Sequence, residues 1–390
     1  MLIKLLFALI VVISITISFF YFNDGGELDN SIKHQLKFEK DNSINISFFD
    51  FYQFNRSFGQ ASYGLSSADF NDDGLMDFAA SYATSPFNYS TISLFYNQGN
   101  LTFGQKDIFK SNFSYIQDLE VADFDNDGDI DLIFSFNEHR WVDDLLYNTN
   151  GTIILLLNDG KDNFLNLSIV SRRTTDTINN PEIRINPQLS SSDYDKDGDI
   201  DLIVGDNSGK IELFLNNGVG VFESNGIIDD FGSVSWGLTS VDVNNDTNID
   251  VVAAASTGNE YSLIPGYLYF IKNIGDKNCF SSSNYSIIGN IPSILGTGCL
   301  VTLDITNDGN IEIFMGISDE IYIFKKTNDT YNSDLLYRFP KNSNGNLEDL
   351  SRGGLDVGDF NNNGLDDFIT GGCQGVIRLF INKGDQIHSN

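Results

Sequence analysis

Cysteine, histidine and tryptophan are scarce in this sequence. Its 390 residues include three cysteines, three histidines and two tryptophans. Three cysteines are too few for a disulfide framework; Cys279 and Cys299 could pair in an exported protein, or all three could be small buried apolar residues. The sequence also has no G-x-S-x-G nucleophile elbow, no His/Cys cluster with zinc spacing and no phosphate-binding glycine loop. Local motifs therefore indicate no catalytic site.

Positive charge is also in short supply. There are 23 Lys and Arg residues against 54 Asp and Glu residues, which gives a formal net charge of −31 at pH 7. A chain this acidic repels the phosphates of nucleic acid, so we exclude nucleic acid as a partner. Aromatic residues make up 13% of the chain. Together with many β-branched residues, they favour an all-β domain with a substantial core.

Many of the acidic residues lie in a loop that recurs six times, in the form DFDNDGDIDL from Asp123. The other copies begin at Asp69, Asp193, Asp242, Asp304 and Asp359. Carboxylates or amides at loop positions 1, 3, 5 and 9, with a glycine for the turn at position 6, are the oxygen ligands that calcium prefers. Strands flank each copy, whereas an EF-hand needs helices. One such loop could be an ordinary acidic turn, but six copies in one register favour calcium sites.

The predicted calcium ligands occupy positions 1, 3, 5 and 9 of each loop. In chain order they are Asp69, Asn71, Asp73 and Asp77; Asp123, Asp125, Asp127 and Asp131; Asp193, Asp195, Asp197 and Asp201; Asp242, Asn244, Asp246 and Asp250; Asp304, Thr306, Asp308 and Glu312; and Asp359, Asn361, Asn363 and Asp367. The second and third loops, with carboxylates at all four positions, are expected to bind most tightly. The fourth has Thr247 where a glycine is wanted, so its backbone must be strained or change shape. The fifth has threonine at position 3 and the sixth only two carboxylates, so both are expected to bind weakly.

A second marker follows each loop: an apolar strand that ends in an Asn-x-Gly turn. It begins at Ile92, Ile153, Ile211, Tyr267 and Val376, while the fifth copy, from Ile321, has a changed turn. The loops recur at intervals of roughly 50 to 70 residues, in the range of one propeller blade with insertions. Each unit predicts a four-stranded antiparallel blade. We expect a six-bladed β-propeller in which the N-terminal strand Ser43–Phe54 completes the last blade, with seven blades as the alternative.

These repeats resemble a known family. Phe58-Gly59 and Phe231-Gly232 match the FG half of the FG-GAP signature at the right distance before an acidic loop, although no repeat has the GAP half. Over roughly Phe58 to Gly384 the chain resembles FG-GAP or VCBS-repeat proteins, the calcium-loop propeller family that includes the integrin α-chain head. It is nearer the microbial VCBS type. The resemblance implies a calcium-bound propeller and does not carry over integrin-like ligand recognition.

The N-terminus carries a long apolar run, Leu5–Phe22. Its length is close to what spans a bilayer as a hydrophobic helix, and it ends without a small-residue cleavage pattern. Lys4 precedes the run and acidic residues follow it, which orients the rest of the chain outward. We expect a signal anchor over residues 1–23, with a cleaved signal peptide as the alternative, a linker over 24–35 and the propeller over 36–390. The protein would then be extracytoplasmic and membrane-anchored, or secreted.

Two long segments are expected to form a ligand face. Antiparallel blades put all six acidic loops on one face and the other class of connections on the opposite face. On that opposite face we expect two long loops, Asn137–Gly151 and Ser171–Gln188. They contain Arg140, Trp141, Arg172 and Arg173. These side chains could contact an acidic or glycan partner, with the tryptophan as a stacking platform; alternatively, the arginines merely offset local acid.

Together these features favour a binding module over an enzyme. We expect a surface-displayed, calcium-stabilised propeller that engages a protein or glycan partner. The alternatives are a polysaccharide-active lyase or hydrolase, whose catalytic residues would be scattered along the chain, and a structural component of the cell envelope.

Overall fold

The computed structural model describes the following residues: 34–40, 49–54, 64–84, 89–111, 115–142, 145–161, 163–164, 166–174, 187–231, 235–256, 266–275, 279–291, 298–305, 309–317, 319–328, 330–339, 354–372 and 376–384. Over these residues the chain forms strands, turns and bends, with no helix, so the all-β prediction is confirmed. The hydrophobic helix predicted over residues 1–23 lies outside the described residues. Within the described part of the chain, no helix has the length and apolar character to span a membrane.

The strands follow one another in runs of four that pair antiparallel within each run. A parallel contact joins the fourth and fifth runs into one eight-stranded sheet, and the first and last runs belong to one nine-stranded sheet. The first three runs are β3 (Leu65–Ala68), β4 (Asp77–Thr84), β5 (Tyr89–Asn97) and β6 (Thr102–Ser111); β7 (Tyr115–Ala122), β8 (Asp131–Val142), β9 (Leu145–Leu157) and β10 (Asn166–Thr174); and β11 (Gln188–Ser192), β12 (Asp201–Gly205), β13 (Lys210–Asn216) and β14 (Phe222–Asp230). The next are β15 (Ser235–Val241), β16 (Asp250–Ser256), β17 (Gly266–Asn273) and β18 (Phe280–Asn290); and β19 (Leu300–Leu303), β20 (Glu312–Ile317), β21 (Glu320–Thr327) and β22 (Thr330–Arg338). The last run is β23 (Leu355–Gly358), β24 (Asp367–Thr370), β25 (Arg378–Asn382) and the N-terminal β2 (Phe49–Phe54).

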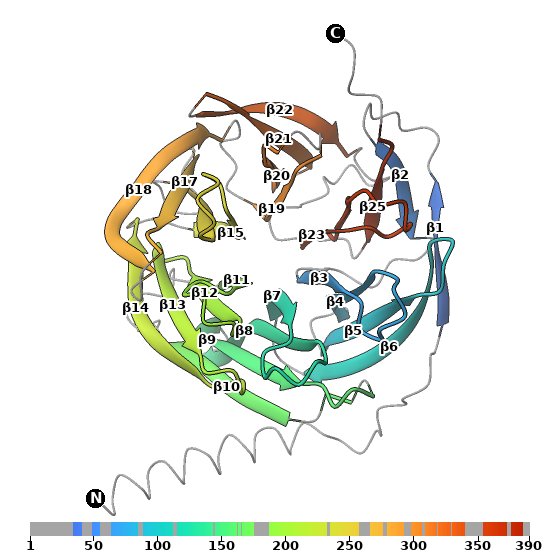
Figure 1. Cartoon of the computed structure of the whole chain (residues 1–390). Coiled ribbons are helices and arrows are strands. Elements are labelled where there is room, and N and C mark those ends of the chain that lie inside the picture. The colour runs from blue at the N-terminus through green and yellow to red at the C-terminus, as the bar shows by residue number, and fades with distance from the viewer. Residues whose placement is uncertain are drawn as a thin grey trace, which may run out of the picture.

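The runs are arranged in a ring around a central opening (Figure 1). The first strand of each run lies innermost, and these strands contact one another in the circular order β3, β7, β11, β15, β19, β23 and back to β3. Antiparallel four-stranded sheets packed side by side around an axis form a β-propeller arrangement. This arrangement brings residues from distant parts of the sequence to one axis.

The N-terminal strand closes the ring, as the sequence predicts. β2 pairs antiparallel with β25, with Phe49 opposite Asn382 and Phe51 opposite Phe380. An additional strand, β1 (His34–Lys40), pairs with both β2 and β6 and so joins the outer edges of the last and first runs. This strand begins before residue 36, where the propeller was expected to start. Pairing leaves fewer strand edges open to a second chain.

The core lies between neighbouring runs. β12 is buried along its whole length, because its two faces pack against different neighbours in the ring. Aromatic side chains fill several of these layers: Phe78 stacks on Phe95 with ring centroids 4.6 Å apart, and Phe368 stacks on Phe380 at 4.2 Å. Full burial of one such side chain contributes about 1.5–3 kcal/mol. The packed layers provide a rigid frame for the loops at the strand ends.

Candidate metal-binding loops

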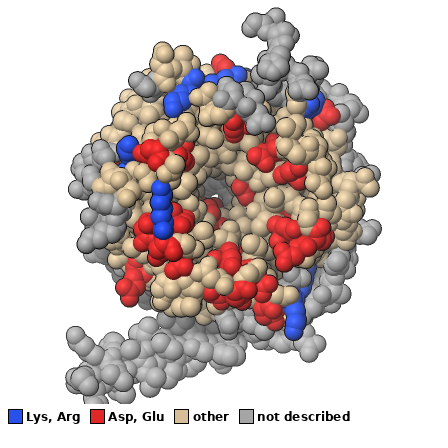
Figure 2. Space-filling view, in the orientation of Figure 1, with Lys and Arg blue, Asp and Glu red and all other residues tan. Residues whose placement is uncertain are grey.

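Each acidic loop joins the innermost strand of a run to the second strand, so antiparallel pairing places the loops at the same end of the ring. Figure 2 shows acidic side chains gathered in separate patches around the central opening. The loop wraps around its first carboxylate. In the second loop, Asp123 accepts hydrogen bonds from the backbone N–H groups of Asp127 at 3.1 Å and Gly128 at 3.0 Å. The equivalent bonds form at Asp193 and Asp242.

Left-handed backbone conformations bend the loops. Gly128 and Gly198 at position 6 have φ of 96° and 98°, respectively. A glycine adopts this conformation without steric cost. Thr247 holds the same position in the fourth loop with φ of 73°, a costly conformation for a β-branched residue. The backbone strain predicted at Thr247 is therefore confirmed.

The carboxylate at position 9 is the buried anchor of each loop. Asp77, Asp131, Asp201, Asp250 and Asp367 are fully buried and Glu312 nearly so. Asp131 shows the shared pattern, accepting the backbone N–H of Phe124 at 2.9 Å and that of Asn158 at 2.8 Å. These bonds tie the start of the loop to the turn after the third strand. Position 9 therefore has a structural task besides its predicted role as a metal ligand.

Burial makes these anchors hard to ionise without a nearby cation. It raises the pKa of Asp77, Asp131, Asp201 and Asp367 to about 7 and that of Asp250 to about 6. The backbone N–H groups act in the opposite direction, and carboxylates at other loop positions raise the pKa further. A cation in the loop would favour the ionised form of every one of these groups.

The second and third loops have the arrangement that best fits a cation. Oxygen atoms of Asp123, Asp125 and Asp131 all lie within 4.8 Å of one another, and so do those of Asp193, Asp195 and Asp197. Among the described residues, these are the two groups of three or more potential ligands that lie so close. Burial, with repulsion from neighbouring carboxylates, raises the pKa of Asp125 and Asp195.

Asp125 provides the most direct indication that the second loop can accommodate a cation. Its Oδ1 atom is shielded from solvent and has no hydrogen-bond partner in the described part of the chain. A buried carboxylate oxygen without a partner is costly. A calcium ion coordinates carboxylate oxygens of this kind, so the donors of the second loop fit that ion.

The first, fifth and sixth loops differ from the second and third in their predicted ligand residues. In the first, Asn71 Oδ1 accepts the backbone N–H of Asp73 at 3.0 Å. In the fifth, Asp304 accepts the N–H of Gly309 at 2.8 Å, while Thr306 and Asp308 lie outside the described residues. In the sixth, Asp359 accepts the N–H groups of Asn363 and Gly364 at 3.0 and 2.7 Å. In the sixth loop the turn around the first carboxylate is therefore kept with fewer carboxylates.

The asparagine of the Asn-x-Gly marker joins neighbouring runs, a role that the sequence did not reveal. In the first, third and fourth runs its side-chain amide donates to the carbonyl of loop position 2 in the preceding run, from Asn97 to Phe360 at 3.0 Å, Asn216 to Phe124 at 2.7 Å and Asn273 to Tyr194 at 2.8 Å. The fifth run lacks this asparagine. Lys326 stands in its place and donates from Nζ to the carbonyl of Val243 at 3.1 Å. The changed turn therefore keeps the contact between runs with another donor.

The proposed ligand residues lie on strands rather than in a long loop. The segment predicted as the loop Asn137–Gly151 is largely a hairpin, because β8 extends to Val142 and β9 begins at Leu145. Continued pairing, with Trp141 opposite Leu146, satisfies backbone groups that a loop would leave to solvent. Arg140 also lies on β8, while Arg172 and Arg173 lie on β10 opposite Thr152 and Gly151 of β9. All four thus belong to one sheet, and the positions of their side chains lie outside the described structure.

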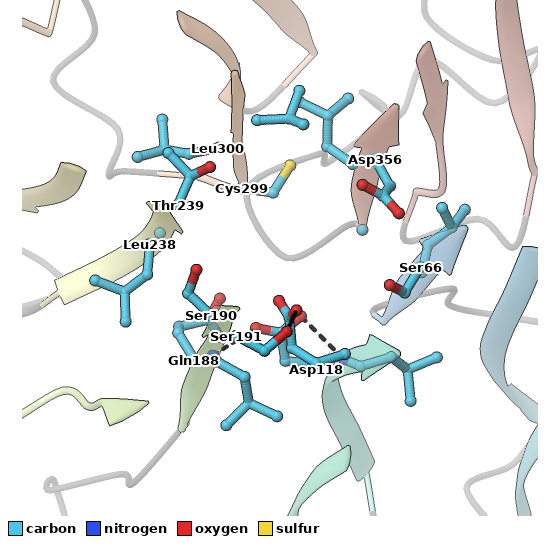
Figure 3. Close-up of a pocket in the computed structure, with 18 of the residues that line it drawn as sticks. Ser66, Asp118, Gln188, Ser190, Ser191, Leu238, Thr239, Cys299, Leu300 and Asp356 are labelled. Carbon is cyan, nitrogen blue, oxygen red and sulfur yellow. Dashed lines mark hydrogen bonds between the residues drawn. The ribbon is translucent and has the colours of Figure 1, made fainter. Parts of the chain in front are cut away.

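A cavity of about 330 Å³ lies where the innermost strands of all six runs meet. Its polar lining includes Ser66, Asp118, Glu120, Ser190, Ser191, Thr239, Thr302 and Asp356. Figure 3 shows the side chains of Asp118, Ser190 and Asp356 directed toward the same opening. The sequence did not reveal this cavity, because its carboxylates come from β7 and β23, far apart in the chain. The signal was an acidic pair at alternate positions, Asp118 and Glu120, within an otherwise ordinary strand.

The cavity carboxylates are held by short hydrogen bonds. Asp118 accepts the backbone N–H of Leu189 at 2.8 Å, and Glu120 accepts the hydroxyl of Ser191 at 2.7 Å. Burial, with smaller contributions from mutual repulsion, raises the pKa of Asp118 to about 7 and that of Glu120 to about 8. Burial likewise raises the pKa of Asp356 to about 6. The cavity therefore favours the protonated forms of these three carboxyl groups more than water does.

Comparison with known proteins identifies the repeats. The FG-GAP-like repeat family matches residues 57–134 and 193–253, segments that contain the first four acidic loops. These two segments are similar to FG-GAP-like repeats, and the predicted resemblance is confirmed. Among solved structures, an Agrocybe aegerita lectin described by its specific recognition of non-reducing terminal N-acetylglucosamine is similar over 90% of this chain and 99% of its own, with 14% identity and a TM-score of 0.44. No curated protein matches the sequence.

Proposed function

Because this chain has segments similar to FG-GAP-like repeats on a propeller scaffold, we propose that it is an extracytoplasmic, calcium-stabilised binding module. In this proposal the six runs of strands are six blades, and calcium bound in the acidic loops, above all the second and third, holds those loops in shape. The opposite side of the ring engages a protein or glycan partner at the cell surface. The N-terminal apolar run anchors the module in the membrane.

The observation that carries the calcium proposal is the second loop. Three of its carboxylates converge within 4.8 Å, and Asp125 Oδ1 is buried without a hydrogen-bond partner among the described residues. Like charges at this distance repel one another strongly. Calcium, when bound, supplies the positive charge and the coordination that these oxygens need. The third loop, with Asp193, Asp195 and Asp197, supports the same reading.

Calorimetric titration of the full chain with calcium tests this proposal. Asp125→Asn and Asp195→Asn should each remove one tight site from the binding isotherm. Asn361→Ala, in the sixth loop, is the matched control and should leave the tight sites unchanged. An isotherm without saturable calcium binding, or one that neither aspartate variant alters, would refute the proposal.

The partner site is proposed on the sheet formed by β8, β9 and β10. Arg140, Trp141, Arg172 and Arg173 lie on β8 and β10, and they bring positive and aromatic residues together in a chain with a net charge of −31. A Trp141→Ala/Arg172→Ala double variant should lose capture by immobilised acidic glycans or proteins while keeping its calcium-dependent melting. Undiminished capture would place the partner site elsewhere. Absence of capture by the wild-type chain would favour a structural role in the envelope.

The central cavity favours a second candidate, a polysaccharide-active lyase or hydrolase. Glu120 has its pKa raised to about 8, so its carboxyl group can carry a proton at neutral pH as a general acid must. Incubation with a panel of acidic and neutral polysaccharides should then release oligosaccharides, and Glu120→Gln should abolish the release. An inactive wild-type chain, combined with specific capture, would favour the binding module.

Membrane anchoring is tested by expression of the chain with and without residues 1–23. The full chain should sediment with membranes and require detergent for extraction, while the shortened chain should not. Release of the full chain into the medium would indicate a cleaved signal peptide instead.

A further inference from the structure

A lysine contacts the fourth acidic loop from within the same run of strands. Lys272 lies near the end of β17, and its Nζ is 2.9 Å from Oδ2 of Asp246, the residue at loop position 5. The other oxygen of Asp246 accepts the backbone N–H of Asn248 at 3.0 Å. Both oxygens of this predicted calcium ligand therefore already have a donor in the chain itself.

The corresponding position differs in the loops that fit a cation best. Lys272 directly precedes the asparagine of its turn, and the residue in that place is Leu157 in the second run and Leu215 in the third. Leucine cannot supply a charge, and there the carboxylates converge without one. The fifth run also has a lysine, Lys325, but it lies 3.7 Å from Asp334 on β22.

Other ligand positions of the fourth loop are also occupied by donors. The side-chain amide of Asn244, at position 3, donates to Oδ2 of Asp250 at 2.9 Å. Asp242 accepts the N–H groups of Asp246 and Thr247, as Asp123 and Asp193 accept the equivalent groups in their loops, so the difference lies in the contacts of Asn244 and Lys272. Although this loop has three carboxylates, no set of three comes within 4.8 Å there in the described structure. The oxygen ligands of the fourth loop are therefore not arranged for calcium as those of the second and third loops are.

We propose that Lys272 takes the place of a metal ion in the fourth loop, so that its ammonium group supplies the positive charge that calcium supplies in the second and third loops. The fourth loop then stays folded when calcium is removed and contributes no calcium site. This inference rests on the proposed function in one respect, namely that the second and third loops bind calcium. It gives the ring one loop that is independent of calcium.

The first test is calorimetric titration of the full chain with calcium. Asp195→Asn should reduce the number of tight sites by one, whereas Asp246→Asn should leave that number unchanged. An Asp246→Asn variant that loses one site, as Asp195→Asn does, would overturn the inference. If the wild-type chain binds no calcium at all, the proposed function fails, and the second test decides the inference alone.

The second test measures thermal unfolding in excess EDTA. Lys272→Met and Asp246→Asn should each lower the melting temperature, and the double variant should lower it by no more than either single change. Lys272→Arg, which keeps the positive charge, should behave as the wild type. Strictly additive effects of the two single changes, or a Lys272→Met variant as stable as the wild type, would show that the contact does not hold the loop.

Discussion

The acidic loops and the central cavity both gather carboxylates, but the fold satisfies them in different ways. At one end of the ring, the loops surround their first carboxylate with backbone N–H groups. In the second loop, one oxygen of Asp125 has no hydrogen-bond partner among the described residues. In the cavity, Asp118, Glu120 and Asp356 face the ring axis beside hydroxyl groups, with raised pKa values. The loop arrangement fits a bound cation, whereas the cavity favours carboxyl groups in their protonated form. The loops should therefore respond to calcium and the cavity to pH.

The largest effect is expected from Asp131→Ala. This change removes the anchor of the second loop and leaves the buried N–H groups of Phe124 and Asn158 without their acceptor. Each lost partner of a buried group costs about 1–3 kcal/mol, so with two such groups the free energy of unfolding should fall by about 2–6 kcal/mol even in EDTA. Urea unfolding in EDTA measures this loss. A loss that occurs only in calcium would mean that Asp131 acts solely as a ligand.

A smaller effect, confined to calcium, is expected from Asp125→Ala and Asp195→Ala. A site at a hundredfold excess of calcium over its Kd contributes about 2.7 kcal/mol to the free energy of unfolding. Each variant should therefore be less stable than the wild type by about this amount in calcium, and nearly as stable as the wild type in EDTA. Asn361→Ala should lose less under both conditions. Equal losses for all three variants in calcium would contradict the ranking of the loops.

The cavity should make the protein less stable as the pH rises. The pKa of Glu120 is raised from 4.5 to about 8, so the folded state holds this proton more tightly than the unfolded chain. The resulting stability is complete below the unfolded pKa and is lost as the pH rises through about 8; Asp118 and Asp356 act in the same direction. The slope for one group is at most about 1.4 kcal/mol per pH unit.

Saturating calcium separates this pH dependence from that of the loops, whose bound carboxylates would already be ionised. Under that condition Glu120→Gln should flatten the decline in unfolding free energy between about pH 5 and about pH 8. Denaturant unfolding across this range provides the measurement. An unchanged slope would mean that Glu120 is ionised in the folded protein, which would remove the contrast between cavity and loops.

The smallest effect, and a favourable one, is expected at Thr247. Its φ of 73° is costly for a β-branched residue, and Thr247→Gly should relieve about 1 kcal/mol of strain, less the added flexibility of the unfolded chain. The variant should also lose the hydrogen bond that Lys196 donates to Thr247 Oγ1 at 3.1 Å. A rise in melting temperature of a few degrees would support the strain argument, whereas a fall would show that the hydrogen bond outweighs it.

The sequence was sufficient for the repeat, the ring closure and the loop positions. The spacing of Asp123, Asp125, Asp127 and Asp131 defines a loop shape by itself, and regular recurrence of that loop implies units packed around an axis. The closure by β2 followed from counting strands, because the last unit lacks one. Features that depend on residues close together in the sequence could therefore be predicted from the sequence alone.

The features that were missed depend on contacts between distant residues. The segment His34–Lys40 was divided between linker and propeller, although it pairs with β2 and β6. The hairpin of β8 and β9 was expected as a loop, since its polar residues resemble loop residues and its pairing lies across the turn. The cavity could not be found because Asp118 and Asp356 come together only when the ring closes. The contact between Lys272 and Asp246 likewise requires the register of β17.

The most direct test of the account is the thermal unfolding of the full chain, in mild detergent, in excess calcium, in excess EDTA and in magnesium. We expect a melting temperature several degrees higher in calcium than in EDTA, because calcium binds the folded loops and not the unfolded chain. Magnesium, which demands a tighter octahedral geometry, should give a smaller shift. Superimposable unfolding curves in calcium and EDTA would contradict the claim that calcium stabilises this propeller.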